Sequence, residues 1–232
     1  MALVSTSTTT ANGTAAVLAD LGPIAQLRAG GLGRRLPQLY AGLVLYGLSI
    51  AMMVRSDLGV APWDVLHTGV THHLPFTIGQ VLVGVSFLVL VFWIPLREKP
   101  GIGTVSNALV IGFSADLFLS VLSTPDSLVA RAALVVGGVV LCGLATAVYI
   151  GAQLGRGPRD GLMTGLSRRT GLSLRLVRTG LEITVVVIGL LLGGALGFGT
   201  VLYALGIGPL TQAMLPYVIA PVSVRDVVTS AE

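Results

Sequence analysis

A short pattern containing Gly, Pro, Asp and Thr occurs twice in the chain, and the two copies lie 96 residues apart. Residues 58–69 read Leu-Gly-Val-Ala-Pro-Trp-Asp-Val-Leu-His-Thr-Gly, and residues 154–165 keep the Leu, Gly, Pro, Asp, Leu, Thr and Gly in register. Apolar residues often match by chance in such a sequence, whereas turn-forming and polar residues in one order rarely do. We interpret the pattern as a duplicated unit.

The same offset extends the match, without a gap, well beyond this segment. From residue 40 to residue 112, 26 of 73 positions carry the same amino acid 96 residues later. The run Gly-Ile-Gly-Thr-Val at 101–105 returns as Gly-Phe-Gly-Thr-Val at 197–201. We expect Gly103, Thr104, Gly199 and Thr200 to form turns that begin helices, with Thr as the cap.

The composition places this duplicated unit in a membrane. Of the 232 residues, 53% are hydrophobic and only 10% are charged, and the mean hydropathy is +0.90. A soluble domain of this size does not need so much apolar surface, so we expect a lipid bilayer as its solvent. The pI of about 9.7 is explained by basic loops that orient membrane helices, and we expect no nucleic-acid partner.

We predict an all-α, polytopic bundle of six membrane helices. The domain prediction assigns 1–35 to a disordered cytoplasmic tail, 36–126 to a first membrane repeat, 127–220 to a second, and 221–232 to a cytoplasmic tail. A short helix within 15–29 is an alternative for part of the first tail. The predicted spans cover about 37–54, 77–96, 103–122, 128–150, 173–192 and 199–220.

Three spans in each half give the two repeats opposite orientations, because an odd number of crossings reverses the entry side of the second half. With the N-terminus inside, the inner segments hold twelve of the fourteen basic residues, and the outer side holds only Arg55 and Arg131. This distribution is typical of a protein that follows the positive-inside rule. We therefore expect a multi-pass protein of the cytoplasmic membrane with both termini in the cytoplasm.

The repeated segment predicts a short helix in each half. Gly59 and Gly155 permit a sharp turn, and Pro62 and Pro158 suit the first turn of a helix. A helix over about 62–73 would be roughly 18 Å long, too short to span a bilayer. Two alternatives stay open: re-entrant helices that form a transporter's substrate site, or amphipathic helices that lie at the two interfaces.

Six polar residues are candidates for substrate binding. Asp64 and Asp160 occupy matching positions near the positive ends of the two short helices. Asp116 and Glu182 lie inside predicted spans, where ionisable groups are costly and usually functional, although Glu182 could simply pair with Arg178 one turn before it. Asn107 and Tyr203 occupy matching positions and could line a path or bond between helices.

The same residues argue against catalysis and metal binding. His67, His72 and His73 do not share one helical face and have no acidic partner pattern, so we expect no metal. The chain has no Ser/His/Asp set, no His-Glu-x-x-His motif and no paired carboxylates at matching depth, so we expect no enzyme. We expect no cofactor either, and Cys142 as a packing residue.

The residues at 57–66, 101–104 and 157–163 resemble the bacterial YczE/YyaS/YitT membrane proteins, nearest the YczE-like branch. The resemblance covers roughly residues 38 to 216. We expect no counterpart of the soluble C-terminal domain of YitT-type members. The family is largely uncharacterised, so the resemblance implies a bacterial membrane protein rather than a reaction, and some relatives are discussed as exporters.

Two functions compete on this basis. The first is a transporter or exporter of an unknown small-molecule substrate, with its site between the inverted halves. The second is a non-transporting membrane accessory protein that binds a partner through its basic cytoplasmic face. The sequence leaves the substrate, the direction, the coupling ion and the oligomeric state open.

Overall fold

A computed structural model describes residue 18 and residues 22–222. These residues form α-helices joined by short connections, and they contain no strand, which confirms the predicted all-α class. The helices are α1 (Pro23–Arg28), α2 (Leu32–Ser56), α3 (Pro62–Thr71), α4 (Ile78–Leu96), α5 (Ile102–Val121), α6 (Leu128–Gly151), α7 (Pro158–Thr170), α8 (Leu174–Leu191) and α9 (Phe198–Val218).

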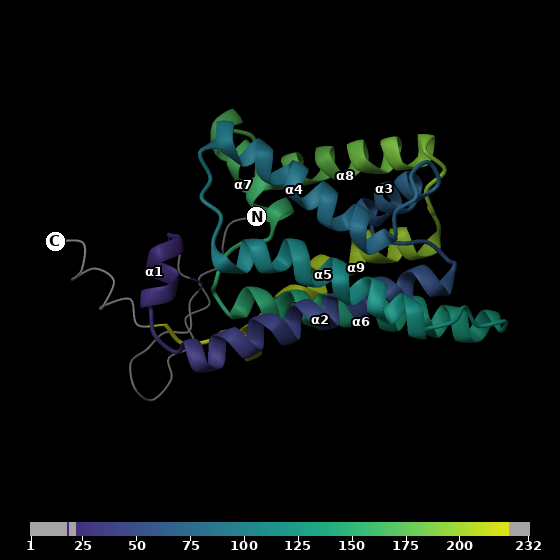
Figure 1. Cartoon of the computed structure of the whole chain (residues 1–232), viewed down its shortest axis with the longest axis horizontal. Helices are drawn as coiled ribbons and strands as arrows, with labels where there is room; N and C mark the ends of the chain where they lie inside the picture. Colours follow the sequence, from purple (N-terminus) through teal and green to yellow (C-terminus); the bar gives the residue numbers. More distant parts are fainter. Residues whose placement is uncertain (1–17, 19–21, 223–232) are drawn as a thin grey trace.

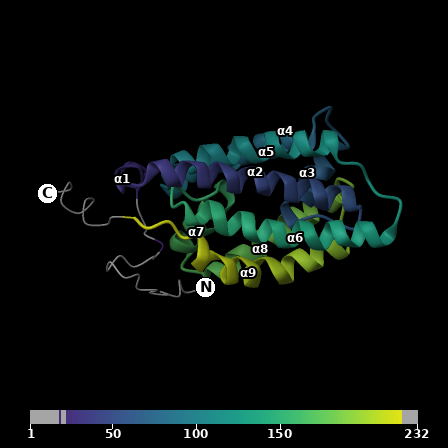
Figure 2. The same cartoon turned by 90° about the horizontal axis from the view of Figure 1, so that it is seen from below.

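The helices form two layers (Figures 1 and 2). In the first layer, α2 packs along α6 at the centre, α5 packs on α2, and α9 packs on α6. The second layer holds α4 and α8 together with the short helices α3 and α7. The two described ends of the chain lie at one end of the bundle, where Gln153 donates a hydrogen bond to the Ala220 carbonyl. We call this the N-terminal end of the bundle.

Five helices within the described residues are long and apolar enough, by length and composition, to cross a membrane: α2, α4, α5, α6 and α9. Helix α8, which occupies the predicted fifth span, is not among them because Arg175, Arg178 and Glu182 interrupt its apolar sequence. The outer surface carries large exposed apolar side chains, such as Ile94, Phe113 and Val129. These surfaces fit contact with lipid.

The predicted boundary of the N-terminal tail differs from the structure. Residues 23–35, which the sequence assigns to a disordered tail, form α1 and the first turn of α2. The cause is Arg35, which is 1% exposed and donates hydrogen bonds to the carbonyls of Gln26, Gly30, Ala152 and Gln153. The rest of the predicted tails, residues 1–17, 19–21 and 223–232, lies outside the described residues.

The chain breaks in the same way after α2 and after α6. Asp57 and Gln153 both have a φ of 54°, and two residues later Gly59 and Gly155 have φ values of 107° and 131°. Each break then binds the other half: the Leu58 carbonyl accepts from the Gly199 N–H at 2.7 Å, and the Leu154 carbonyl accepts from the Gly103 N–H at 2.8 Å. The two halves are therefore held together by matching backbone hydrogen bonds.

Each short helix packs against a long helix from the other half of the chain. Helix α7 lies on α4, where the Trp93 ring covers Gly161 so closely that a Cβ atom there would collide with it. Helix α3 lies on α8, where a Cβ atom on Gly189 would lie 2.6 Å from the backbone of Val65. A glycine thus permits close packing in both contacts, on the short helix in one and on the long helix in the other.

The two halves differ in one contact. Helices α4 and α5 pack so tightly that Gly79 faces the Gly112 backbone without room for a Cβ atom. The corresponding helices α8 and α9 do not pack closely, because Arg175 occupies the position that matches Gly79.

Candidate functional site

The first turns of α3 and α7 meet inside the bundle. Trp63 is the second residue of α3, and Arg159 is the matching second residue of α7. The Arg159 guanidinium carbon lies 5.0 Å from the centroid of the Trp63 ring. Because helix N-termini carry partial positive charge and unpaired N–H groups, this junction offers hydrogen-bond donors from two sides.

Asp64 is buried at this junction. It is the third residue of α3 and is only 1% exposed. Its Oδ1 atom lies 2.9 Å from Nδ1 of His67, which is fully buried one turn further along the same helix. Nε2 of His67 and Nε1 of Trp63 are also buried, and neither has a hydrogen-bond partner among the described residues. Buried polar atoms without partners are rare and call for a ligand or water.

Asp160 occupies the matching position on α7 but has different partners. It is partly buried, and its Oδ2 atom accepts a hydrogen bond of 2.9 Å from the Tyr149 hydroxyl of α6. The side chain of Asn107, from α5, lies beside it at Gly157, the residue that precedes α7. Helices α5, α6 and α7 therefore place three polar side chains next to one helix N-terminus.

Arg159 links these two groups of residues. It lies within electrostatic range of Asp64, Asp160 and Tyr203. From α8, Arg178 also lies within range of Asp160 and Tyr203, and its Nε atom donates to Glu182 at 2.8 Å. The Glu182 side chain is 21% exposed. The local Arg178–Glu182 pair predicted as the alternative role of Glu182 is thus present, and it borders the same interior region.

Tyr203 belongs to a mostly apolar group beside this region. It is 8% exposed and packs in a cluster with Met53, Val65 and Cys142. We use the term central cluster for the polar residues that meet around the two helix N-termini. The central cluster comprises Trp63, Asp64, His67, Asn107, Tyr149, Arg159, Asp160, Arg178, Glu182 and Tyr203.

Asp116 lies apart from the other candidates. It follows Asn107 by nine residues on α5, a separation of about 14 Å along the helix axis. Its carboxylate accepts hydrogen bonds from the Thr77 hydroxyl at 2.5 Å and from the Gly79 N–H at 2.8 Å. Asp116 therefore holds the first turn of α4 against α5, and its contacts are those of a helix cap.

Sequence reasoning missed several residues of the central cluster. It counted Arg159 among the basic residues of the inner segments and considered His67 only as a metal ligand, and it did not single out Tyr149. One signal for Arg159 was present, because it occupies the position that matches Trp63 in the repeat. Tyr149 carried no such signal, since the matching residue is Met53.

Comparison with known proteins places the chain among bacterial relatives. The profile of a family of unknown function (DUF6198) matches residues 33–216. An uncharacterized protein of Haemophilus influenzae is 40% identical over 177 residues, which cover 76% of this chain and 81% of the relative. The uncharacterized membrane protein YczE of Bacillus subtilis is 33% identical over 179 residues, which cover 76% of this chain and 83% of YczE.

A further relative is the uncharacterized protein YyaS of Bacillus subtilis, 30% identical over 184 residues, which cover 76% of this chain and 90% of YyaS. No solved structure matches the chain. The match region of the family includes every residue of the central cluster.

Proposed function

The chain is an integral membrane protein that belongs to the family of unknown function DUF6198, and from this premise we propose that it transports a small polar solute through the central cluster. The observation that carries the proposal is the junction of α3 and α7, where the buried Nε1 atom of Trp63 and the buried Nε2 atom of His67 have no hydrogen-bond partner among the described residues. A bound solute would accept from the Trp63 indole N–H and donate to Nε2 of His67, whose Nδ1–H donates to the Asp64 carboxylate.

The proposal includes an inverted relation between the two halves. Three observations support it: the 96-residue offset of the repeat, the matching breaks at Gly59 and Gly155, and the reciprocal hydrogen bonds of Leu58 and Leu154. The two described chain ends also lie at one end of the bundle, as an even number of crossings requires. Helix α8 is the sixth crossing in this proposal, and the partly buried Arg178–Glu182 pair lies on its interior side.

Helices α3 and α7 are re-entrant in this proposal. Most of α3 is buried among other helices, including Pro62, Trp63, Asp64 and Val65, whereas an interfacial helix leaves one face in water and headgroups. Non-helical backbone is tolerated within a bilayer only where protein or a wet cavity surrounds it. Broken helices whose N-termini point to the midplane form the substrate sites of many secondary transporters.

Substitution of Asp64 and Asp160 tests the site. We expect Asp64→Asn and Asp160→Asn each to lower the flux of the transported solute by about tenfold or more. A reduction of this size corresponds to the loss of one charge-assisted hydrogen bond to the solute. Stability should change by about 1 kcal/mol or less, since Asn also caps helices and can bond to His67 or Tyr149. The measurement is uptake by proteoliposomes of a panel of radiolabelled amino acids, nucleosides and organic acids.

Asp126→Asn is the matched control, because Asp126 is exposed in the connection between α5 and α6. It should leave both flux and stability unchanged. If the two cluster variants transport as well as the wild type, the site assignment is lost. If the wild type moves none of the panel while it is folded, the accessory-protein alternative gains support.

The proposed orientation has a separate test. We expect reporter fusions after Pro100 and after Pro221 to lie in the cytoplasm, and a fusion after Asp126 to lie outside. The reason is that most of the basic residues outside the crossings then lie on the inner segments. Paired phosphatase and fluorescent-protein reporters measure each site independently. An external reading at Pro221 would contradict six crossings and with them the inverted relation.

A further inference from the structure

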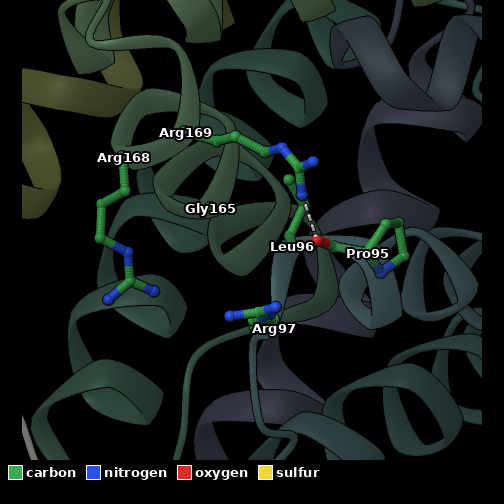
Figure 3. Close-up of a pocket in the computed structure, with 6 residues that line it drawn as sticks. All are labelled: Pro95, Leu96, Arg97, Gly165, Arg168 and Arg169. Carbon is green, nitrogen blue, oxygen red and sulfur yellow. Dashed lines mark hydrogen bonds between the residues drawn. The ribbon is translucent and has the colours of Figure 1, made fainter.

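A cavity rich in arginine lies between the end of α4 and the last turns of α7. Its volume is about 370 Å³. Figure 3 shows Arg168 and Arg169 extending from α7 toward the end of α4, which is followed by Arg97. The residues that line the cavity are Pro95, Leu96, Arg97, Gly165, Arg168 and Arg169.

The three arginines are held in different ways. Arg169 donates a hydrogen bond from its guanidinium to the Pro95 carbonyl, and Arg168 forms an ion pair with Glu98. The backbone N–H of Arg97 bonds to the Ile94 carbonyl at 3.1 Å, which fixes the start of its side chain. The Arg97 guanidinium has no hydrogen-bond or ion-pair partner in the part of the chain that the structure describes.

The charges around the cavity favour an anion. Glu98 neutralises only one of the three guanidinium groups, so the cavity keeps an excess of positive charge. Guanidinium groups present donors in a planar fork that matches the oxygens of a phosphate. The cavity is also open to the surface, because Arg97, Arg168 and Arg169 are all exposed. The shared chemistry of its ligand is thus a phosphate group.

The surface beside the cavity favours a lipid as the source of that phosphate. Just before Pro95, α4 presents exposed apolar side chains: Val91 is 57%, Phe92 53% and Ile94 76% exposed. An acyl chain can lie on these side chains while its headgroup enters the cavity. A free phosphate would gain nothing from them. Basic pockets between membrane helices are known to bind anionic headgroups.

We propose that this cavity binds the phosphate headgroup of an anionic phospholipid, in the leaflet at the N-terminal end of the bundle. The Arg97 guanidinium, which has no partner among the described residues, binds the phosphate. Arg168 and Arg169 line the opposite wall of the cavity. The acyl chains run along α4 toward the middle of the bilayer. The site is separate from the central cluster, so it neither requires nor excludes transport.

Lipid titration of the full-length protein in detergent tests this proposal. Native mass spectrometry would count bound phosphatidylglycerol and phosphatidylcholine as each is added. We expect wild-type protein to bind phosphatidylglycerol more tightly than phosphatidylcholine. Arg97→Gln should weaken phosphatidylglycerol binding about fivefold, the typical contribution of one basic residue at an anionic surface. The Arg97 substitution removes no hydrogen bond or ion pair within the described residues. An Arg168 substitution, in contrast, would remove the ion-pair partner of Glu98.

Arg175→Gln is the matched control, because Arg175 is an exposed arginine that does not line the cavity. It should bind both lipids as the wild type does. Equal binding of the two lipids, or an equal loss in both variants, would overturn the proposal. A parallel titration with inorganic phosphate separates the two sources: displacement of the lipid by millimolar phosphate would overturn the lipid assignment, and its retention would support it. Thermal unfolding of both variants shows that they are folded.

Discussion

Replacement of Arg35 with Met should destabilise the protein by about 3 kcal/mol or more, because several buried carbonyls would lose a charged donor at once. The Arg35 side chain bonds to Gln26 and Gly30 near α1 and to Ala152 and Gln153 after α6. Methionine fills a similar volume but donates nothing. For a chain of this size, we expect the melting temperature to fall by roughly 6–12 °C.

Arg34→Met provides the matched control for this experiment. Arg34 is the neighbouring residue on α2, has the same charge, and is exposed. Its replacement should shift the melting temperature of the detergent-solubilised protein only slightly. A melting temperature for Arg35→Met as high as that of the Arg34 variant would mean that the four carbonyls find water instead, and that Arg35 does not hold the N-terminal end together.

Replacement of Gly59 with Ala should destabilise the protein by about 3–5 kcal/mol, since it adds backbone strain to a backbone collision. Gly59 has a φ of 107°, which side chains rarely adopt, and its new Cβ atom would lie 2.6 Å from the Gly197 nitrogen. Neither backbone can move freely, because the adjacent Leu58 carbonyl bonds to Gly199. We expect poor membrane insertion or a large drop in melting temperature.

Two further alanine variants calibrate this result. Gly155 has a φ of 131°, but its Cβ atom would lie 3.1 Å from the Thr104 hydroxyl, so Gly155→Ala should cost less than Gly59→Ala. Gly180 on α8 has nothing within 4 Å of its Cβ position, so Gly180→Ala should be neutral or slightly stabilising. An equal effect of the Gly59 and Gly180 substitutions would refute the role of the tight backbone contact.

Long apolar stretches predicted the main features of the fold. They identified an all-helical membrane protein, and the structure and the relatives confirm this class. The alternative of a short helix within 15–29 includes α1, but the sequence did not predict that α2 begins at Leu32, because the partners of Arg35 at Ala152 and Gln153 lie more than a hundred residues away. It also did not predict that α4 packs closely on α5 while the corresponding helices α8 and α9 do not, since the repeat favours equivalent contacts in both halves.

The candidate site was only partly accessible to sequence reasoning. The repeat indicated Asp64 and Asp160, and both lie beside the junction of α3 and α7. Burial inside a span also indicated Asp116, yet its contacts are with the first turn of α4. The position of a residue along a helix indicates its depth in the membrane but not the direction in which its side chain points. The sequence pattern therefore could not distinguish Asp116 from Asp64 and Asp160. Arg159 contacts Trp63 across the two halves, and a contact of that kind follows only from tertiary structure.

The exchanged packing of the short helices sets the order of events during synthesis. Val65 of α3 packs against Gly189 of α8, which the ribosome adds 124 residues later. At roughly 5–20 residues per second, α3 waits about 6–25 seconds for its partner. Throughout that interval α3 lacks its contact with α8, although α6, which carries Val139 and Cys142, is made earlier. The packing of the first half is therefore complete only after α8 has been synthesised.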